Sequence, residues 1–329
     1  MLDDPGLDRR ELTAALRSGY GIEATAFTFV RGYDQRAASY DVTATDGRWF
    51  VKVRFGASPT EALEVPRALR DAGVPNILAP ITTRAGALLH PMDGDRNLVT
   101  YPFATGRSAM EAGMTEEQWR LFGTTLRAVH DTGFEAAFAG RLPSETFALP
   151  SAEVVRRVLA RLGRPRSGTA AERLDEVLRR QAGRIGSMLE RAEALGSILR
   201  HRRFERVLCH ADIHAANILV TRDGGILLVD WDGPMLAPRE RDLLFVIGSR
   251  IARDVEPHEE ALFFEGYGEV QVDSEALIYY RYERILEDIG EISRSVFDDP
   301  GPSETSRVGE VRLLEALIAP AALEAVERV

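Results

Sequence analysis

The chain has 329 residues, of which 45% are hydrophobic and 28% charged, and 51 acidic residues against 41 basic ones give a formal charge of −10. This composition excludes a mainly disordered or collagen-like chain, and the acidic balance argues against a protein that grips nucleic-acid phosphates through a basic patch. No apolar run reaches the length of a membrane span, and the acidic first residues do not resemble a secretory leader. The one cysteine, Cys209, cannot form a disulfide within the chain, so we expect a cytoplasmic protein.

The first hundred residues alternate β-type runs with helical patterns. Asp46-Gly47 separates two of the runs and is a strong hairpin signal, because tight hairpin turns favour this pair. The expected elements are a helix at about 7–18, strands at 26–30, 39–43 and 48–54, a helix at about 58–72, and strands near 78–82 and 97–101. We therefore expect a small antiparallel sheet accompanied by helices.

Helical patterns dominate from about residue 115 onward, with one interruption by short apolar strands. The expected strands are 206–209, 218–220 and 226–229, and the expected helices include 172–203, 240–252, 258–266, 275–294 and 306–327. The pattern predicts an α+β chain with two lobes. We place a small N-terminal lobe at 1–100, a hinge at 101–107, and a larger, mainly helical C-terminal lobe at 108–329.

Polar residues with the spacing H-x-D-x-x-x-x-N lie between two of these strands. They are His210, Asp212 and Asn217, and Asp230 follows the third strand. Phosphoryl transfer needs a carboxylate that orients the attacking hydroxyl and accepts its proton, and oxygen ligands that hold Mg²⁺ on the nucleotide phosphates. We assign the catalytic role to Asp212 and the metal to Asn217 and Asp230, because Mg²⁺ prefers hard oxygen ligands.

Lys52 lies inside the apolar strand 48–54, where an ammonium group is costly unless it finds an anion. We expect it to cover the nucleotide phosphates and to be held by a glutamate of the following helix. Glu61 is the preferred partner and Glu64 the other candidate. The alternative is an exposed strand face that carries Lys52 into solvent, because side chains alternate along a strand.

His210 is expected to orient its loop through backbone hydrogen bonds, since no nucleophile is visible beside it in the sequence. A zinc site made by Cys209, His210 and His214 is disfavoured. Its spacing matches no common zinc site, and adjacent residues of a strand point to opposite faces. Cys209 is therefore interpreted as a small core residue.

The order of Lys52, Glu61, the segment Tyr101-Pro102-Phe103, the motif 210–217 and Asp230 resembles the aminoglycoside phosphotransferase family. The resemblance extends over essentially the whole chain. It implies a bilobal protein-kinase-like fold and a nucleoside triphosphate bound with Mg²⁺, ATP being expected and GTP not excluded. It also implies that backbone groups at Tyr101, Pro102 and Phe103 bind the adenine.

The first strand turn departs from the protein-kinase pattern. Residues Arg31–Gln35 lack a Gly-x-Gly-x-x-Gly sequence. The resemblance therefore leaves the phosphate contacts there to backbone N–H groups and to Ser39.

Four stretches are similar to the spectinomycin phosphotransferases within this family, namely 208–214, 230–243, 257–268 and 279–284. The similarity implies phosphorylation of a hydroxyl on spectinomycin or another aminocyclitol, and antibiotic resistance as the role. Trp231 and Asp232 are the expected substrate wall, because they adjoin a metal ligand.

Glu283, Glu287 and Glu291 recur every four residues on the helix 275–294 and form one acidic stripe. Glu287 is assigned to the substrate, since such a stripe suits a cationic amine. The alternative is a solvated helix face, which the spacing alone favours.

Two other functions stay open. A metabolic kinase of the same fold would phosphorylate choline, homoserine, methylthioribose or a sugar amine, and a catalytically dead module would bind only the nucleotide. The acidic charge suits a cationic small molecule as the partner, with no role for nucleic acid or a membrane. The sequence does not define the oligomeric state.

Overall fold

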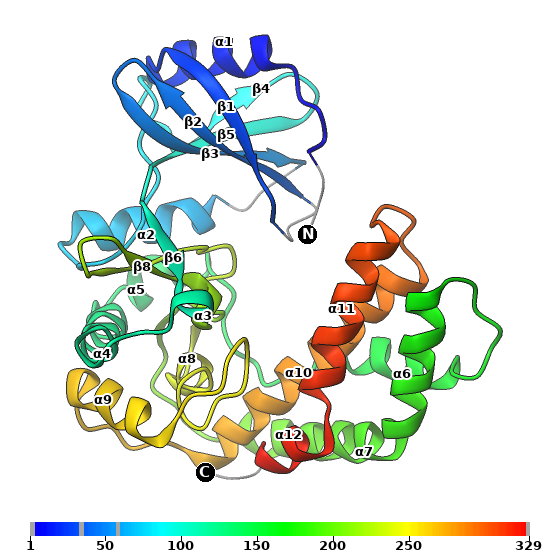
Figure 1. The fold of residues 1–329 in the computed structure, drawn as a ribbon. Helices are drawn as coiled ribbons and strands as arrows, with labels where there is room; N and C mark the ends of the chain where they lie inside the picture. Colours follow the sequence, from blue (N-terminus) through cyan, green and yellow to red (C-terminus); the bar gives the residue numbers. More distant parts are fainter. Residues whose placement is uncertain (1–3, 33–35, 57–59, 327–329) are drawn as a thin grey trace.

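The computed structural model describes residues 4–32, 36–56 and 60–326, and it has two parts (Figure 1). A five-stranded antiparallel sheet lies at one end, and a larger, mainly helical part lies at the other. The strands of this sheet are β1 (Ala24–Val30), β2 (Ala37–Ala44), β3 (Gly47–Phe55), β4 (His90–Met92) and β5 (Arg96–Pro102), in the order β1-β2-β3-β5-β4. The predicted α+β class, with a small sheet-bearing lobe and a larger helical lobe, is confirmed.

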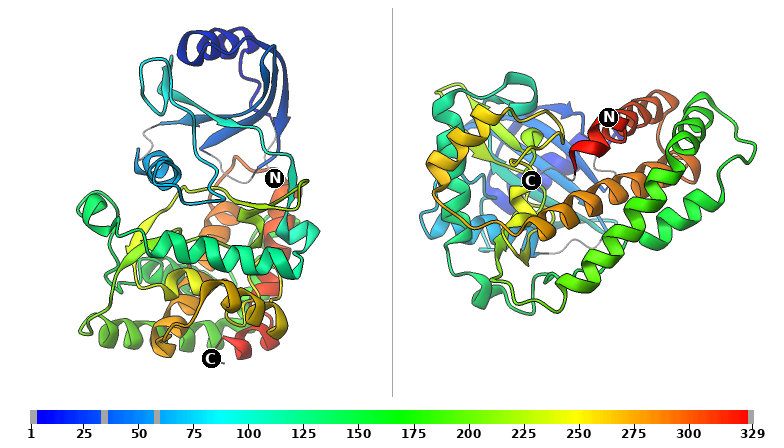
Figure 2. Two further views of the ribbon diagram at one scale, coloured as in Figure 1. Left: turned by 90° about the vertical axis from the view of Figure 1, so that its left-hand side faces the viewer. Right: turned by 90° about the horizontal axis from the view of Figure 1, so that it is seen from below.

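The two faces of the sheet differ in chemistry. α1 (Arg9–Tyr20) lies across the outer face, away from the helical part (Figures 1 and 2). The apolar core under α1 is built from Leu12, Leu16, Tyr40, Val42, Val51, Val53 and Leu98. Lys52 and Arg54 alternate with two of these valines, so their side chains leave β3 on the inner face, toward the helical part.

The predicted hairpin between β2 and β3 is confirmed. Ala44 lies opposite Gly47, and the same register places Ser39 opposite Lys52. Gly47 has a φ of 146°, a conformation that glycine adopts without the steric penalty of a side chain. This register brings Ser39 to the inner face together with Lys52.

α2 (Glu61–Asp71) lies below the sheet, between the two parts of the molecule (Figure 1). The prediction of a strand near 78–82 is wrong, and β4 is the edge strand that pairs with β5. Pro80 has no N–H to donate, and the N–H groups of Leu78 and Ile81 bond to two different segments, at Leu228 and Thr100. The segment therefore bridges the two parts rather than extending one sheet.

The helical part is built around two long helices that pack side by side (Figure 2, right). Its helices are α3 (Ala109–Ala112), α4 (Glu116–His130), α5 (Glu135–Phe138), α6 (Ala152–Ala160), α7 (Thr169–Leu199), α8 (Glu240–Leu243), α9 (Pro257–Tyr267), α10 (Ser274–Phe297), α11 (Glu304–Leu317) and α12 (Pro320–Ala325). The long pair is α7 and α10, and α6 and α11 pack against both. Within the described ranges, no helix combines the length and apolar character that a membrane crossing requires.

Two helix predictions in this part are too long. The helix predicted over 240–252 ends at Leu243, and Gly248 and Ala252 adopt positive φ values of 51° and 64° that a right-handed helix does not accommodate. The helix predicted over 306–327 is divided into α11 and α12 at Pro320, because proline cannot donate the helical hydrogen bond.

The three predicted strands of the second part are present and position its polar residues. β7 (Val207–Cys209) pairs with β10 (Met235–Ala237), and β8 (Ile218–Thr221) lies between β6 (Gly106–Ser108) and β9 (Ile226–Leu228). The segment between β7 and β8 contains Asp212 and Asn217. The segment between β9 and β10 contains Asp230 and Asp232.

Candidate active site

A buried carboxylate holds the start of the loop that follows β7. The two carboxylate oxygens of Asp242 accept hydrogen bonds from the backbone N–H groups of His210, at 2.9 Å, and Ala211, at 2.7 Å. Ala211 has a φ of 69°, which is unfavourable for a residue with a Cβ atom. The contact with Asp242 therefore stabilises a strained backbone one residue before Asp212.

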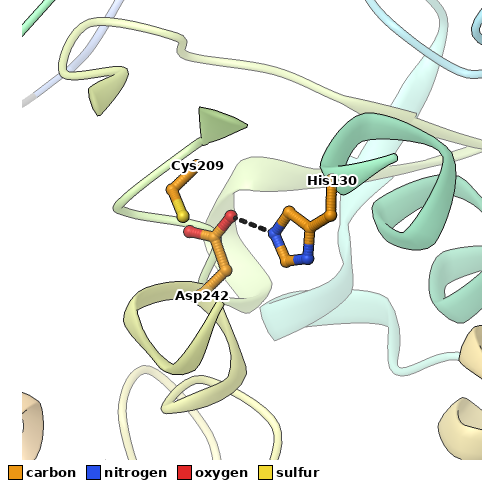
Figure 3. A group of neighbouring side chains, drawn as sticks. All are labelled: His130, Cys209 and Asp242. Carbon is orange, nitrogen blue, oxygen red and sulfur yellow. Dashed lines mark hydrogen bonds and ion pairs between the residues drawn. The ribbon is translucent and has the colours of Figure 1, made fainter. Parts of the chain in front are cut away.

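Asp242 belongs to a buried cluster with His130 and Cys209 (Figure 3). Among the residues that the structure describes, this is the group whose metal-ligand atoms lie within 4.8 Å of one another. Its polar atoms already have protein partners, since His130 contacts Asp242 at 3.0 Å and the Tyr267 hydroxyl at 2.7 Å. Burial raises the pKa of the Asp242 carboxyl, but the contacts with His130 and His210 together keep that pKa below its usual value. The cluster therefore anchors the loop.

His210 orients the loop through the backbone, as predicted. Its Nε2 lies 3.0 Å from the carbonyl oxygen of Val229, and its ring packs on Trp231 with centroids 4.4 Å apart. Trp231 is 3% exposed and belongs to the main apolar core. The prediction that Trp231 lines a substrate wall is therefore wrong, because its indole is directed inward against His210.

Asp212 is contacted from three directions. Its Oδ1 accepts a hydrogen bond at 2.5 Å from Arg284 of α10 and lies 3.6 Å from His214. The side-chain amide of Asn217 donates to the Asp212 carbonyl at 2.8 Å and lies 3.5 Å from its carboxylate. The Asp212 carboxylate remains partly exposed, so an acceptor hydroxyl can reach it.

Arg284 neutralises part of the negative charge around Asp212. It also pairs with Asp288, at 3.3 Å, one helical turn further along α10. Burial opposes the charge of Arg284, but Asp288 and Asp212 keep its pKa above the ordinary value. Burial raises the pKa of Asp288 to about 6, although Arg284 counteracts it. Glu287 lies on the same helix, half-buried.

The predicted acidic stripe of α10 is not continuous. Glu283 is buried and paired with Arg241. Burial raises the pKa of Glu283 to about 7 despite this partner. Glu291 is exposed and lies 3.6 Å from Arg294. Glu287 and Glu291 thus remain as the acidic groups of the stripe that a ligand can reach.

Asn217 and Asp230 are neighbours through the backbone. The N–H of Val229 donates to the carbonyl of Asn217 at 3.0 Å, which brings the end of β9 beside the loop that contains Asp212. Asp230 has a φ of 64°, and its side chain is 52% exposed. A half-exposed carboxylate on a segment bonded to that of Asn217 fits Mg²⁺, which takes few protein oxygen ligands and keeps several waters.

Lys52 reaches this edge from the other lobe. Its Nζ lies 2.7 Å from Oδ2 of Asp232 and 3.4 Å from Oδ1 of Asp230. Among the residues that the structure describes, the predicted ion pair between Lys52 and Glu61 is not formed, and the segment after β9 supplies the two carboxylates that contact Lys52 there. The other candidate, Glu64, pairs with Arg141.

Asp232 does not line a substrate wall in this structure. Its second oxygen lies 3.2 Å from Arg54, so the carboxylate bridges two cations of β3. Burial would raise the pKa of Asp232, but Lys52 and Arg54 keep it below the usual value. Burial raises the pKa of Asp230, which Lys52 only partly offsets. Asp232 therefore faces the sheet.

The segment Tyr101-Pro102-Phe103 leaves β5 beside this edge. Tyr101 lies opposite Phe50 on the inner face of the sheet, and burial raises its pKa to about 12. Phe103 packs under the guanidinium of Arg48, at 3.8 Å. Pro102 and Phe103 also line a cavity of about 700 Å³, whose lining does not include Lys52 or the residues at 212, 217 and 230. Ser39 lies opposite Lys52, whereas residues 33–35 of the predicted phosphate-contacting turn lie outside the described residues.

Three residues of the site escaped the sequence analysis. Arg54 carried a signal, since it is a second cation in an apolar strand, two residues from Lys52. Asp242 lies in one of the stretches that support the family resemblance, but nothing in its local pattern indicates a bond to a loop 31 residues away. Arg284 also lies in one of these stretches, but its contact with Asp212 depends on how α10 crosses the loop, which no local pattern indicates.

Comparisons with known proteins identify the family of the chain. Residues 28–279 match the model of the phosphotransferase enzyme family. Protein StrN of Streptomyces griseus is 32% identical over 190 residues, a match that spans 55% of this chain and 57% of StrN. The chain thus aligns with little more than half of that relative.

Solved structures align over nearly the whole chain. Spectinomycin phosphotransferase APH(9)-Ia, in complex with ADP and spectinomycin, superposes with a TM-score of 0.89 at 29% identity, covering 98% of both chains. The amicoumacin kinase hAmiN shares the fold, with a TM-score of 0.62 at 16% identity over 95% of this chain and 94% of its own. The predicted kinase-like fold is therefore confirmed, and the chain belongs to the phosphotransferase enzyme family.

Proposed function

We propose that the protein transfers the γ-phosphate of ATP to a hydroxyl group of a small cationic aminocyclitol, with spectinomycin as the acceptor. The observation that carries the proposal is the convergence of Lys52, Asp212, Asn217 and Asp230 at one edge between the two lobes. Lys52 lies 3.4 Å from Asp230, and Asn217 lies 3.5 Å from the Asp212 carboxylate. The likeness to APH(9)-Ia, crystallised with ADP and spectinomycin, supports both substrates.

In this proposal the nucleotide lies between an N-terminal lobe at 1–100 and a C-terminal lobe at 108–329, which the hinge 101–107 connects. Backbone groups of Tyr101, Pro102 and Phe103 bind the adenine. Ser39 and Lys52, adjacent across two strands, face the phosphates. Asn217 and Asp230 hold Mg²⁺, which supplies positive charge on the phosphates when it is bound.

Asp212 orients the acceptor. It accepts a hydrogen bond from the attacking hydroxyl, whose oxygen forms a bond to the γ-phosphorus while the bond from that phosphorus to the β–γ bridging oxygen breaks. The hydroxyl proton passes to Asp212, and the products are a phosphate ester and ADP. Glu287 faces the amine side of the acceptor, because it is a reachable carboxylate one helical turn from Arg284.

The test is an acceptor panel. Purified protein is incubated with MgATP, or with MgGTP in parallel, and with spectinomycin, other aminoglycosides, choline, homoserine or methylthioribose. We expect ADP release that depends on spectinomycin and a phosphate ester detected by mass spectrometry. Activity on choline alone would assign the metabolic-kinase function instead, and the absence of any nucleotide-dependent thermal shift would favour a dead module.

A variant of the catalytic carboxylate separates chemistry from binding. Asp212→Asn keeps the shape of the side chain and removes its charge and basicity. We expect kcat to fall about 10²-fold or more, while ADP affinity measured by calorimetry changes little. Unchanged turnover would remove Asp212 from its proposed role.

A further inference from the structure

Two cations lie side by side on the inner face of β3. Lys52 and Arg54 are two residues apart, and their side chains are 11% and 9% exposed. Buried like charges at this spacing repel each other and lose hydration, so each needs a carboxylate. The identity of that carboxylate determines what holds Lys52 in place.

Asp232 meets this need for both cations at once. Its Oδ2 lies 2.7 Å from Nζ of Lys52, and its Oδ1 lies 3.2 Å from Nη1 of Arg54. Each carboxylate oxygen thus serves one cation. Asp230 is farther from Lys52, at 3.4 Å, and its side chain is 52% exposed.

In protein kinases a glutamate of the N-lobe helix holds the corresponding lysine. Within the described ranges of this chain, no glutamate of α2 contacts Lys52. Glu64 pairs with Arg141 of the helical part, and Asp230 and Asp232, which contact Lys52, belong to the segment after β9.

We propose that Asp232, fixed by Arg54, is the positioning residue that holds Lys52 for the nucleotide phosphates. This inference rests on the proposed phosphotransferase function and deepens it. The two carboxylates after β9 then have different roles: Asp232 holds the cations of the sheet, and Asp230 binds the metal. An ammonium group has three N–H donors, so the contact with Asp232 occupies one of them and is compatible with donation to a phosphate oxygen when the nucleotide is bound.

A double-mutant cycle tests the proposal. Asp232→Asn, Lys52→Met and the double variant are compared for kcat/KM and for MgADP affinity by calorimetry. Loss of one charge-assisted contact predicts about a tenfold loss for Asp232→Asn in the wild-type background. In the Lys52→Met background the same change is expected to cost less than about twofold, because Asp232 acts through Lys52.

Three further variants and one control define the size of the effect. Arg54→Met is expected to reproduce part of the loss, and Asp232→Glu to restore part of it. Glu61→Gln is the direct competitor, and we expect it to leave MgADP affinity within about twofold of wild type. Asp71→Asn is the matched control, because this aspartate pairs with Arg67 on the exposed side of α2. Thermal unfolding of each variant shows whether it is folded.

The outcomes are distinguishable. Losses at 52 and 232 that multiply, with a raised half-saturating Mg²⁺ concentration in Asp232→Asn, would make Asp232 a metal ligand and overturn the proposal. A loss of MgADP affinity in Glu61→Gln as large as that in Asp232→Asn would show that Glu61 of α2, and not Asp232, holds Lys52. If the wild-type protein neither binds nucleotide nor phosphorylates any acceptor, the proposed function fails. An active wild type with a fully active Asp232→Asn variant refutes this inference alone.

Discussion

Replacing Asp242 by asparagine removes the negative charge that holds the start of the catalytic loop. The carboxylate is fully buried and bonds to the backbone N–H groups of His210 and Ala211 and to the ring of His130. Asparagine keeps one acceptor oxygen but turns an NH₂ group toward one of the two backbone donors. A buried donor without an acceptor costs about 1–3 kcal/mol, and the remaining bonds weaken because they lose a charged acceptor.

We therefore expect Asp242→Asn to lower the free energy of unfolding by about 3 kcal/mol, from the buried donor left without an acceptor and the weakening of the bonds that had a charged acceptor. That is a large part of the about 5–15 kcal/mol that stabilises a typical protein. Because Ala211 is held at positive φ by this contact, kcat should fall as well, through misplacement of Asp212.

The assay is urea unfolding followed by circular dichroism, with kcat measured on the same preparations. Asp71→Asn is the control, since Asp71 forms an ion pair with Arg67 on α2, has a side chain that is 56% exposed, and should cost less than about 1 kcal/mol. A loss below about 1 kcal/mol for Asp242→Asn, equal to that of the control, would refute the anchoring role.

Three further predictions follow from the buried groups. The pKa of Glu283 is about 7 in the folded protein and 4.5 in the unfolded chain, so its stabilising contribution is complete below about pH 4.5 and is lost as pH rises through 7. The unfolding free energy of wild type minus that of Glu283→Gln should fall by about 1–3 kcal/mol between pH 5 and 8, and a pH-independent difference would contradict the shift. Arg284→Gln should lower kcat about tenfold in steady-state kinetics, while ADP affinity measured by calorimetry stays within about twofold of wild type. An unchanged kcat would show that Asp212 functions without Arg284. Trp231→Ala should lower the free energy of unfolding by about 3–5 kcal/mol in urea unfolding, and Trp231→Phe should lower it clearly less. A raised KM for the acceptor without loss of stability would instead indicate that the indole contacts the substrate.

Local patterns were sufficient to find the main polar side chains of the site. Lys52 interrupts an apolar strand, and Asp212, Asn217 and Asp230 follow or precede short apolar strands. Strand ends are defined by sequence within a few residues, so polar groups at those ends can be located without knowing the rest of the fold. The structure pairs Lys52 with Asp230 and Asn217 with Asp212, and a backbone hydrogen bond from Val229 to Asn217 links the two segments.

Partner choices could not be predicted in the same way. Whether Lys52 meets Glu61 or Asp232 depends on where α2 lies relative to the segment after β9, and no local pattern records that distance. The prediction for Trp231 was wrong for a similar reason, because a large aromatic side chain next to a metal ligand suits the wall of a binding site and the apolar core equally well. The strand predicted near 78–82 is absent because the prediction gave more weight to the apolar residues than to Pro80, which cannot donate a hydrogen bond to a neighbouring strand.

The position of α1 has a consequence for how this protein can change over time. The apolar contacts of the sheet lie on the outer face, beneath Leu12 and Leu16, whereas Lys52 and Arg54 occupy the opposite face. Substitutions that retune nucleotide recognition therefore touch few of the contacts on which folding of that lobe depends. Specificity in this half of the molecule is free to diverge among descendants while its foldability is inherited intact.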